Sequence, residues 1–176
     1  MTYAQKMLSK LRKLEFALNI MVYDFASNVV KGRIAETLVE EMFKKSGYMV
    51  YRFGYEAILE NLSQNRRELQ ESDTLEKIKS IPDFLVVSPS GSVQLIEVKY
   101  SGTGDIQKSR LNRYAEFWKE ARILLVIPNK PHFLINYIEN FLKTEKLFPL
   151  ENDRYTKIDS KIIERFSEVV KQYFKE

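Results

Sequence analysis

Four stretches of the chain are rich in aliphatic and β-branched residues, and their hydrophobic pattern predicts β-strands. They cover residues 48–55, 81–88, 93–100 and 122–128. The last stretch, Arg-Ile-Leu-Leu-Val-Ile-Pro, is hydrophobic almost throughout. This composition is typical of a strand that is buried on both faces of a sheet. The chain is therefore expected to contain a mixed sheet of about four strands.

Hydrophobic residues spaced three and four apart predict helices around these strands. A first helix over residues 3–26 carries a heptad seam made of Met7, Leu11, Leu14, Leu18, Met21 and Phe25. Such a seam either packs on its own domain or pairs with a second copy of the chain. A second helix starts at Ser27 or Asn28 as its cap and ends near Ser46, before Gly47. Its buried side is expected to comprise Val30, Ile34, Ala35, Leu38 and Met42.

Three more helices are expected later in the chain. One has Asp105 as its N-cap and carries Gln107, Leu111, Tyr114 and Trp118 at helical spacing. Another runs from Pro131 to about Lys143. The final helix has an apolar side made of Ile162, Phe166, Val169, Tyr173 and Phe174. Residues 56–80 form a polar, helix-prone insertion, with residues that suit caps or breaks at 63–65 and 72–74.

This order of elements predicts an α/β fold, with the sheet flanked by helices and extra helices at both ends. One domain over residues 1–176 is expected. It comprises an N-terminal helix (1–27), a core (28–130) that includes the insertion, and C-terminal helices (131–176).

Composition narrows the possibilities only a little. The absence of cysteine excludes disulfides and thiolate metal sites and fits a reducing, cytoplasmic location. Residues 16–25 are interrupted by Asn19 and Asp24, so neither a signal peptide nor a membrane span is expected. The net charge of +4 is compatible with a polyanionic partner but is weak evidence for one.

The turn between the second and third strands predicts which residues face each other. Pro89 suits the first position of a type I turn, and Gly91 can take the left-handed conformation that closes a three-residue hairpin loop. A hairpin centred on Ser90 pairs residues whose numbers sum to 180. Asp83 is then opposite Glu97, and the strand period of two adds Lys99 to the same face.

Two carboxylates directly opposite each other in a sheet, roughly 5 Å apart at Cβ, destabilise it. A hard cation such as Mg²⁺ offsets that repulsion, since it binds oxygen ligands and usually takes one or two carboxylates. A neighbouring lysine supplies positive charge for a phosphate or for an attacking water. This combination indicates a divalent-metal phosphodiesterase. The alternative is a solvated acid–base pair on an exposed hairpin.

Pro82-Asp83 followed by Glu97-Val98-Lys99 resembles the signature of the PD-(D/E)XK nuclease superfamily, which has the restriction-endonuclease-like fold. Residues 32–36, Gly-Arg-Ile-Ala-Glu, resemble the Gly-x-x-x-Glu helix of archaeal Holliday-junction resolvases in that superfamily. The resemblance extends from Gly32 to Pro128. The insertion at 56–80 departs from the compact resolvase pattern; it forms either a flap over bound nucleic acid or a surface excursion.

The resemblance implies a restriction-endonuclease-like core that cleaves phosphodiester bonds with Mg²⁺, for which Mn²⁺ would substitute. Asp83, Glu97 and the Val98 carbonyl would ligate the metal. Glu36 would ligate the same or a second metal, or hold one of its waters, with Glu40 as the alternative candidate. Lys99 would orient the nucleophilic water and stabilise charge on the phosphate. A glutamine on the following helix approaches the site in many relatives, which makes Gln107 a candidate.

DNA is the expected substrate, in recombination, repair or restriction. Lys108, Arg110 and Arg113 are expected either to contact phosphate or to form a solvated basic face. A homodimer through the heptad seam or the final helix would allow both strands to be cut. The rival functions are a non-catalytic nucleic-acid-binding or scaffolding protein on the same fold and an RNA-processing nuclease.

Overall fold

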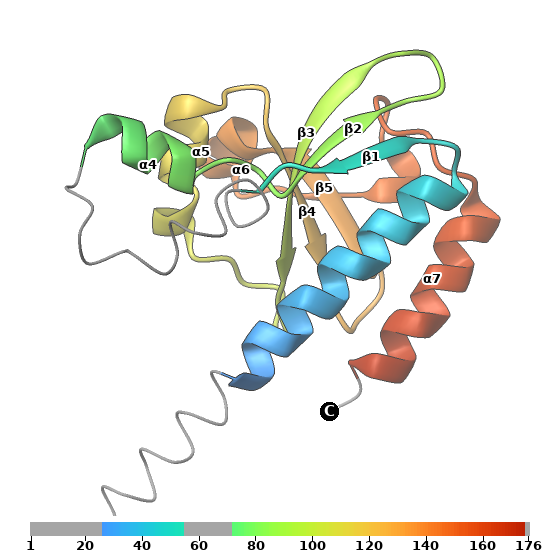
Figure 1. Ribbon diagram of the computed structural model, residues 1–176. Helices are drawn as coiled ribbons and strands as arrows, with labels where there is room; N and C mark the ends of the chain where they lie inside the picture. The colour runs from blue at the N-terminus through green and yellow to red at the C-terminus, as the bar shows by residue number, and fades with distance from the viewer. Residues whose placement is uncertain (1–25, 55–71, 175–176) are drawn as a thin grey trace, which may run out of the picture. The chain divides into compact units, whose positions relative to one another are not determined.

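The computed structural model describes residues 26–54 and 72–174 (Figure 1). The chain divides into two compact units, residues 1–34 and residues 35–176. The sheet and every predicted site residue belong to the second unit. The heptad seam, residues 56–71 of the insertion and the cap candidates at 63–65 lie outside the described residues.

The second unit is an α/β structure built on one mixed sheet whose strands are hydrogen-bonded in chain order, β1 to β6. The strands are β1 (Met49–Arg52), β2 (Phe84–Val87), β3 (Val93–Tyr100), β4 (Arg122–Val126), β5 (Phe133–Tyr137) and β6 (Phe148–Pro149). Only β3 and β4 are parallel; the other neighbouring pairs are antiparallel. The predicted α/β class is confirmed, whereas the prediction of about four strands was too low, since the described residues form six.

One of the two additional strands, β5, lies where the prediction for residues 131–143 was wrong; the other, β6, lies in the connector around Pro149. Residues 131–143 were expected to be one helix, but residues 133–137 form β5, and the helix α6 (Ile138–Thr144) starts only afterwards. The physical reason lies in β4, which is buried along its whole length. A buried strand needs hydrogen-bond partners on both edges. β3 pairs with one edge and β5 with the other, and Phe133 and Ile135 of β5 are buried.

Residues 26–45 are helical, and this helix precedes β1. Ser27 and Asn28 already belong to it, so neither is the predicted cap. It ends before Gly47, whose φ of 82° confirms the predicted left-handed stop. Its fully buried residues are Ala35, Val39, Met42 and Phe43. Val30 was predicted to be buried but is 57% exposed, because the apolar stripe passes through Val39 and Phe43 instead.

The remaining helices are α4 (Asp73–Lys79), the 3₁₀ helix η1 (Lys108–Arg110), α5 (Asn112–Phe117), α6, the 3₁₀ helix η2 (Leu150–Asn152) and α7 (Ser160–Tyr173). Ser72 caps α4 by accepting a hydrogen bond from the Leu75 N–H at 3.2 Å, which agrees with the break expected at 72–74. Asp105 does not cap a helix as predicted. Its carboxylate accepts a hydrogen bond from the Thr103 hydroxyl instead, and the α-helix begins only at Asn112.

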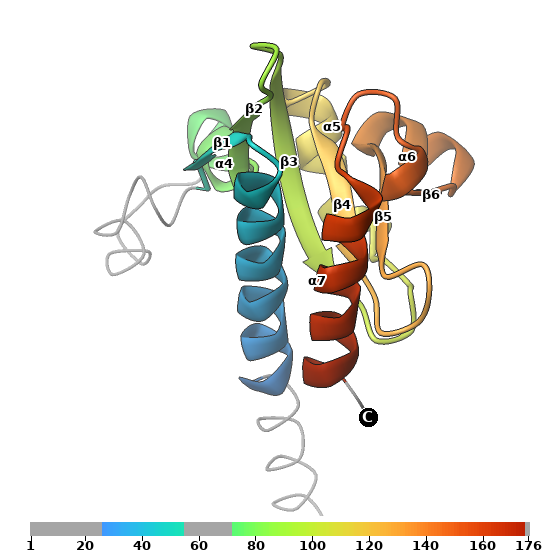
Figure 2. The same ribbon diagram turned by 90° about the vertical axis from the view of Figure 1, so that its right-hand side faces the viewer.

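The sheet lies between two layers of helices. Figure 2 shows α7 on one face, with α5 and α6 on the other. On the α5 and α6 side, Leu111, Ala121, Ile123, Ile138 and Phe141 form a buried cluster. In α7 the prediction was correct in part: Phe174, just after the helix, is buried as expected, whereas Tyr173 is 59% exposed and Val170, which was not predicted, is buried. The buried face of α7 is therefore centred closer to Val170 than the sequence pattern predicted.

One buried cation holds the segment after β6 against the sheet. Arg122, at the start of β4, is 2% exposed and forms a two-pronged ion pair with Asp153, at 2.9 Å and 2.5 Å. It also donates to the Thr156 hydroxyl at 2.8 Å. The rings of Tyr137 and Tyr155 lie 5.0 and 5.5 Å from its guanidinium carbon. Charge-assisted bonds and aromatic faces together compensate the cost of burying this cation.

Candidate active site

The hairpin has the predicted register. Phe84 pairs with Ile96, so Asp83 and Glu97 are the next opposed residues beyond the end of β2. Gly91 has a φ of 84°, and its N–H donates to the Ser88 carbonyl at 2.9 Å, which closes the predicted turn. Local turn chemistry thus brings the two carboxylates to the same place.

The backbone at Asp83 is held from both sides. Its carbonyl accepts hydrogen bonds from the N–H groups of Phe53 at 2.8 Å and Gly54 at 3.1 Å, just after β1. Its own N–H donates to Glu97 Oε2 at 3.3 Å. In return, Asp83 Oδ2 accepts from the Val98 N–H at 2.8 Å. Each carboxylate is therefore bonded to the backbone of the opposite strand, which fixes the positions of both acids.

The two carboxylates lie close together where little water reaches them, so desolvation and mutual repulsion determine their protonation. Glu97 is only 1% exposed. Burial, and after it the negative charge of Glu97, raises the pKa of Asp83 from its ordinary 3.8 to about 8. The charge of Lys99 and the Val98 N–H act in the opposite direction but are weaker. Without a cation, Asp83 therefore holds a proton at neutral pH.

Lys99 supplies the positive charge of the site. Its ammonium is ion-paired with Glu97 Oε1, and its side chain is 36% exposed. Burial lowers the pKa of Lys99, but the negative charges of Glu97, Asp83 and Glu36 outweigh it and leave the pKa raised. The lysine is therefore charged and can face both the carboxylates and solvent.

Tyr114 on α5 lies beside the carboxylate pair, although its sequence pattern, helical spacing alone, did not predict a place in the candidate site. Burial raises its pKa, and the charge of Glu97 and a hydrogen bond to that carboxylate raise it further. Lys99 Nζ lies 5.9 Å from the centre of its ring. Helical spacing alone does not distinguish such a tyrosine from a core aromatic residue, so the sequence carried no separate signal for it.

Of the two candidate glutamates on the helix over 26–45, Glu36 is the one coupled to the site. Its charge is among those that raise the pKa of Lys99. Its side chain is 17% exposed, and Oε2 lies 3.7 Å from Arg52 Nη1. Glu40 is bound to Arg52 at 2.6 Å and to Lys44 at 2.7 Å. Glu40 is thus engaged in a salt-bridge network on the helix surface.

The structure does not place Gln107 as expected. It is exposed and precedes η1 in an extended conformation, rather than lying on an α-helix. The start of α5 is displaced because the loop after β3 continues to residue 107. Within the described residues, its side chain has no hydrogen bond to either carboxylate.

The three basic residues predicted to meet phosphate do not form one patch of available charge. Lys108 is ion-paired with Glu145, and Arg113 with Glu76. Arg110 is exposed and has no ion pair within the described part of the chain. Only Arg110 can therefore accept an anion without first leaving an acidic partner.

The donor set suits a hard divalent cation. Asp83, Glu97 and the Val98 carbonyl offer oxygen only. Among residues 26–54 and 72–174, no group of three or more His, Cys, Asp or Glu side chains is gathered to hold a metal. Mg²⁺ does not need such a cage, because it commonly binds through one or two carboxylates together with water and substrate phosphate.

No helix within the described segments is long and apolar enough to cross a membrane.

Comparisons of the chain with protein-family models, with curated proteins and with solved structures found no match.

Proposed function

We propose that this protein is a Mg²⁺-dependent nuclease that hydrolyses phosphodiester bonds in DNA. The observation that carries the proposal is the Asp83–Glu97 pair: a half-buried and a fully buried acid, held opposite each other by backbone hydrogen bonds, with Lys99 ion-paired to Glu97. Such a pair is costly in a protein that makes no use of it. A bound cation removes that cost.

The order of elements gives further support. The helix over 26–45, β1, the β2–β3 hairpin, α5 and the parallel strand β4 follow one another along the chain. This is the order that a resemblance to the PD-(D/E)XK superfamily implies. Asp83 directly precedes β2, and Glu97 and Lys99 lie in β3; this arrangement supports the proposal.

In the proposed reaction, Asp83, Glu97 and the Val98 carbonyl would hold Mg²⁺. Bound there, the cation would polarise a phosphoryl oxygen and make a water molecule more acidic. Asp83 would release its proton to solvent on metal binding, because the nearby positive charge favours the carboxylate over the protonated acid. Lys99 then turns from Glu97 toward the phosphate and stabilises the negative charge that develops there.

Two further side chains act through the carboxylates. The hydroxyl of Tyr114 holds Glu97 in orientation when Lys99 moves away. Glu36 adds negative charge near Lys99 and can hold a water of the metal. Both are positioning roles that depend on the tertiary structure.

The test is a cleavage assay on single-stranded, duplex and branched DNA and on RNA, with Mg²⁺, with Mn²⁺ and with EDTA. Wild type should cut DNA only with metal, and Asp83→Asn and Glu97→Gln should not cut. Glu139→Gln is the matched control, since Glu139 is an exposed helix glutamate far along the chain in α6. Equal cleavage by wild type and both site variants would overturn the proposal, and cleavage of RNA alone would reassign the substrate.

Metal binding can be measured without any substrate. Mg²⁺ or Mn²⁺ at about a hundred times its Kd should stabilise wild type and Glu139→Gln by about 2.7 kcal/mol. Asp83→Asn and Glu97→Gln should gain much less. The same thermal-unfolding series therefore separates a missing metal site from a missing substrate.

A further inference from the structure

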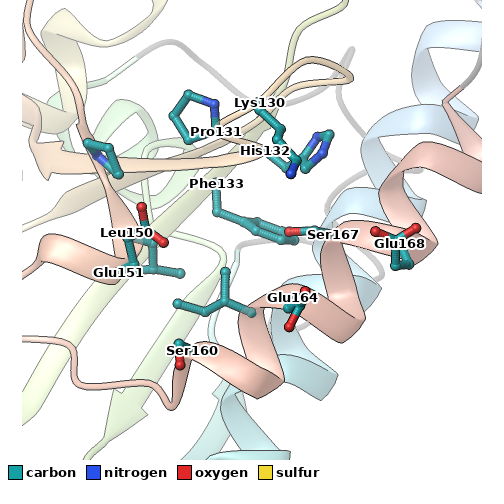
Figure 3. Close-up of a pocket in the computed structure, with 12 residues that line it drawn as sticks. Lys130, Pro131, His132, Phe133, Leu150, Glu151, Ser160, Glu164, Ser167 and Glu168 are labelled. Carbon is teal, nitrogen blue, oxygen red and sulfur yellow. The ribbon is translucent and has the colours of Figure 1, made fainter.

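A second site candidate lies away from the carboxylate pair. A pocket of about 610 Å³ is formed by residues 130–133, the segment 149–151 and α7 (Figure 3). We refer to it as the α7 pocket. Neither Asp83 nor Glu97 nor Lys99 lines it. Its volume lies within the range of about 300–1,000 Å³ that small-molecule pockets occupy.

The α7 pocket combines an apolar floor with an acidic rim. Phe133 and Leu150 are 2% and 1% exposed, and Ile163 of α7 lies with them. The rim carries three carboxylates, those of Glu151, Glu164 and Glu168, against the single ammonium of Lys130. This local excess of negative charge stands out on a chain whose net charge is +4. Phosphate would be repelled here, and a cation attracted.

The carboxylates differ in how far they are already neutralised. Glu168 is bound to Lys171 at 2.5 Å; this hydrogen bond lowers the pKa of Glu168, and the charge of Lys130 nearby acts in the same direction. Glu151 and Glu164 have no ion pair within the described residues. At least two rim carboxylates are therefore available to a ligand.

His132 provides an independent polar group at the pocket wall. It is 4% exposed, and its Nδ1 lies 3.1 Å from the Ile127 carbonyl oxygen. A carbonyl oxygen only accepts, so Nδ1 carries the proton and Nε2 of the neutral ring is an acceptor. Nε2 is buried and has no partner. Figure 3 shows the ring above the turn of α7 that carries Ser167 and Glu168.

An unpartnered buried acceptor costs free energy, and a donor that reaches it recovers that cost. An ammonium or guanidinium group offers such donors and also complements the carboxylates. An apolar stem on the same molecule would cover the floor made by Phe133, Leu150 and Ile163. The rim carboxylates, His132 Nε2 and the apolar floor are thus all complementary to the same kind of molecule.

We propose that the α7 pocket binds a small organic cation in which a guanidinium or ammonium group is carried on an apolar stem. The cation lies between the rim carboxylates and His132 Nε2, with its stem on the apolar floor. This binding is independent of the proposed nuclease function, because the two sites share no residue.

The first experiment compares N-butylguanidinium with N-butylurea, which has nearly the same shape but no charge. Both are titrated into the full-length protein by ¹⁵N NMR in phosphate buffer at matched ionic strength, since amine buffers would compete. N-butylguanidinium should shift the backbone signals of residues 130–133 and 160–168 in a saturable way. Equal binding of the two compounds, or no saturable shift in these segments, would overturn the proposal.

Variants then test the contacts. Glu151→Gln with Glu164→Gln should weaken the binding of N-butylguanidinium by about tenfold, because the two carboxylates without an ion pair in the described residues lose their charge. Glu116→Gln with Glu139→Gln, exposed glutamates of α5 and α6, is the matched control and should bind as wild type. An unchanged affinity in the Glu151/Glu164 variant would refute the pocket as the site. His132→Phe, where it folds, should weaken binding further; the glutamate variants decide the case without it.

Discussion

At the scale of single residues, Asp83 has the property most open to measurement. Its pKa of about 8 in the fold compares with an ordinary value of 3.8. The folded protein therefore holds this proton more tightly than the unfolded chain. The stability associated with it is fully present below pH 4, and it is lost progressively as the pH rises from about 4 to about 8.

Asp83→Asn should mimic the protonated acid and remove this loss. In EDTA, the variant should unfold at a higher temperature than wild type at pH 8, and the difference should shrink toward pH 4.5. Thermal unfolding by circular dichroism across this pH range measures it. A difference that stays constant with pH would mean that Asp83 does not hold its proton in the fold.

Lys99 should matter for chemistry far more than for affinity. Lys99→Ala should slow cleavage by about two to three orders of magnitude, the scale for removal of a charge-stabilising donor. DNA affinity should change little, since one phosphate contact is a small share of binding. Single-turnover rates and binding titrations separate the two effects. Cleavage at the wild-type rate would remove Lys99 from the mechanism.

Tyr114→Phe keeps the ring under Lys99 but deletes the hydroxyl that is bonded to Glu97. A hydrogen bond to a charged group contributes about 1.5–3 kcal/mol, so the cleavage rate should fall by at least about tenfold. A role in positioning Glu97 would also weaken metal binding, which calorimetry with Mn²⁺ measures. Loss of thermal stability with unchanged metal affinity would indicate a packing role only.

At the scale of elements, the Arg122–Asp153 pair ties the segment after β6 to the start of β4. Asp153→Asn leaves a buried guanidinium without its counter-charge, which should destabilise the fold by about 3–5 kcal/mol. Replacing Glu139, which is paired with Lys143 on the surface of α6, should cost much less, because water and salt screen an exposed ion pair. Urea unfolding of both variants measures the difference. Similar decreases in the free energy of unfolding would show that the Arg122–Asp153 pair stabilises the fold no more than a surface ion pair does.

At the scale of the whole molecule, the proposed nuclease function needs a basic surface that contacts the phosphates of nucleic acid. Arg110 is the only residue of the three basic candidates without an ion pair in the described structure. Arg110→Glu should weaken binding of all DNA sequences alike and reduce the salt dependence by about one unit of slope. Lys108→Glu should do less, because Lys108 is already bound to Glu145. Titrations at several salt concentrations decide this, and an unchanged slope for Arg110→Glu would place the DNA elsewhere.

Dimer formation through the heptad seam stays a prediction, since that seam lies outside the described residues.

Local rules were sufficient for the hairpin and for one helix end. Pro89 and Gly91 determine the turn, the turn determines the register, and the strand period then puts Asp83 opposite Glu97 with Lys99 on the same face. Gly47 stops the helix over 26–45 for the same kind of reason, a backbone conformation that glycine favours. These features depend on residues close together in the chain, so the sequence alone determined them.

Other features depend on partners distant in the sequence, and only the tertiary structure decided them. Residues 133–137 became a strand because the free edge of β4 required hydrogen bonds, although their local pattern suited a helix. Tyr114 and Glu36 come from different helices and are brought near Lys99 only when both pack on the sheet. The raised pKa of Asp83 likewise arises from burial. Desolvation and strand pairing are properties of the packed molecule, which spacing along a chain does not contain.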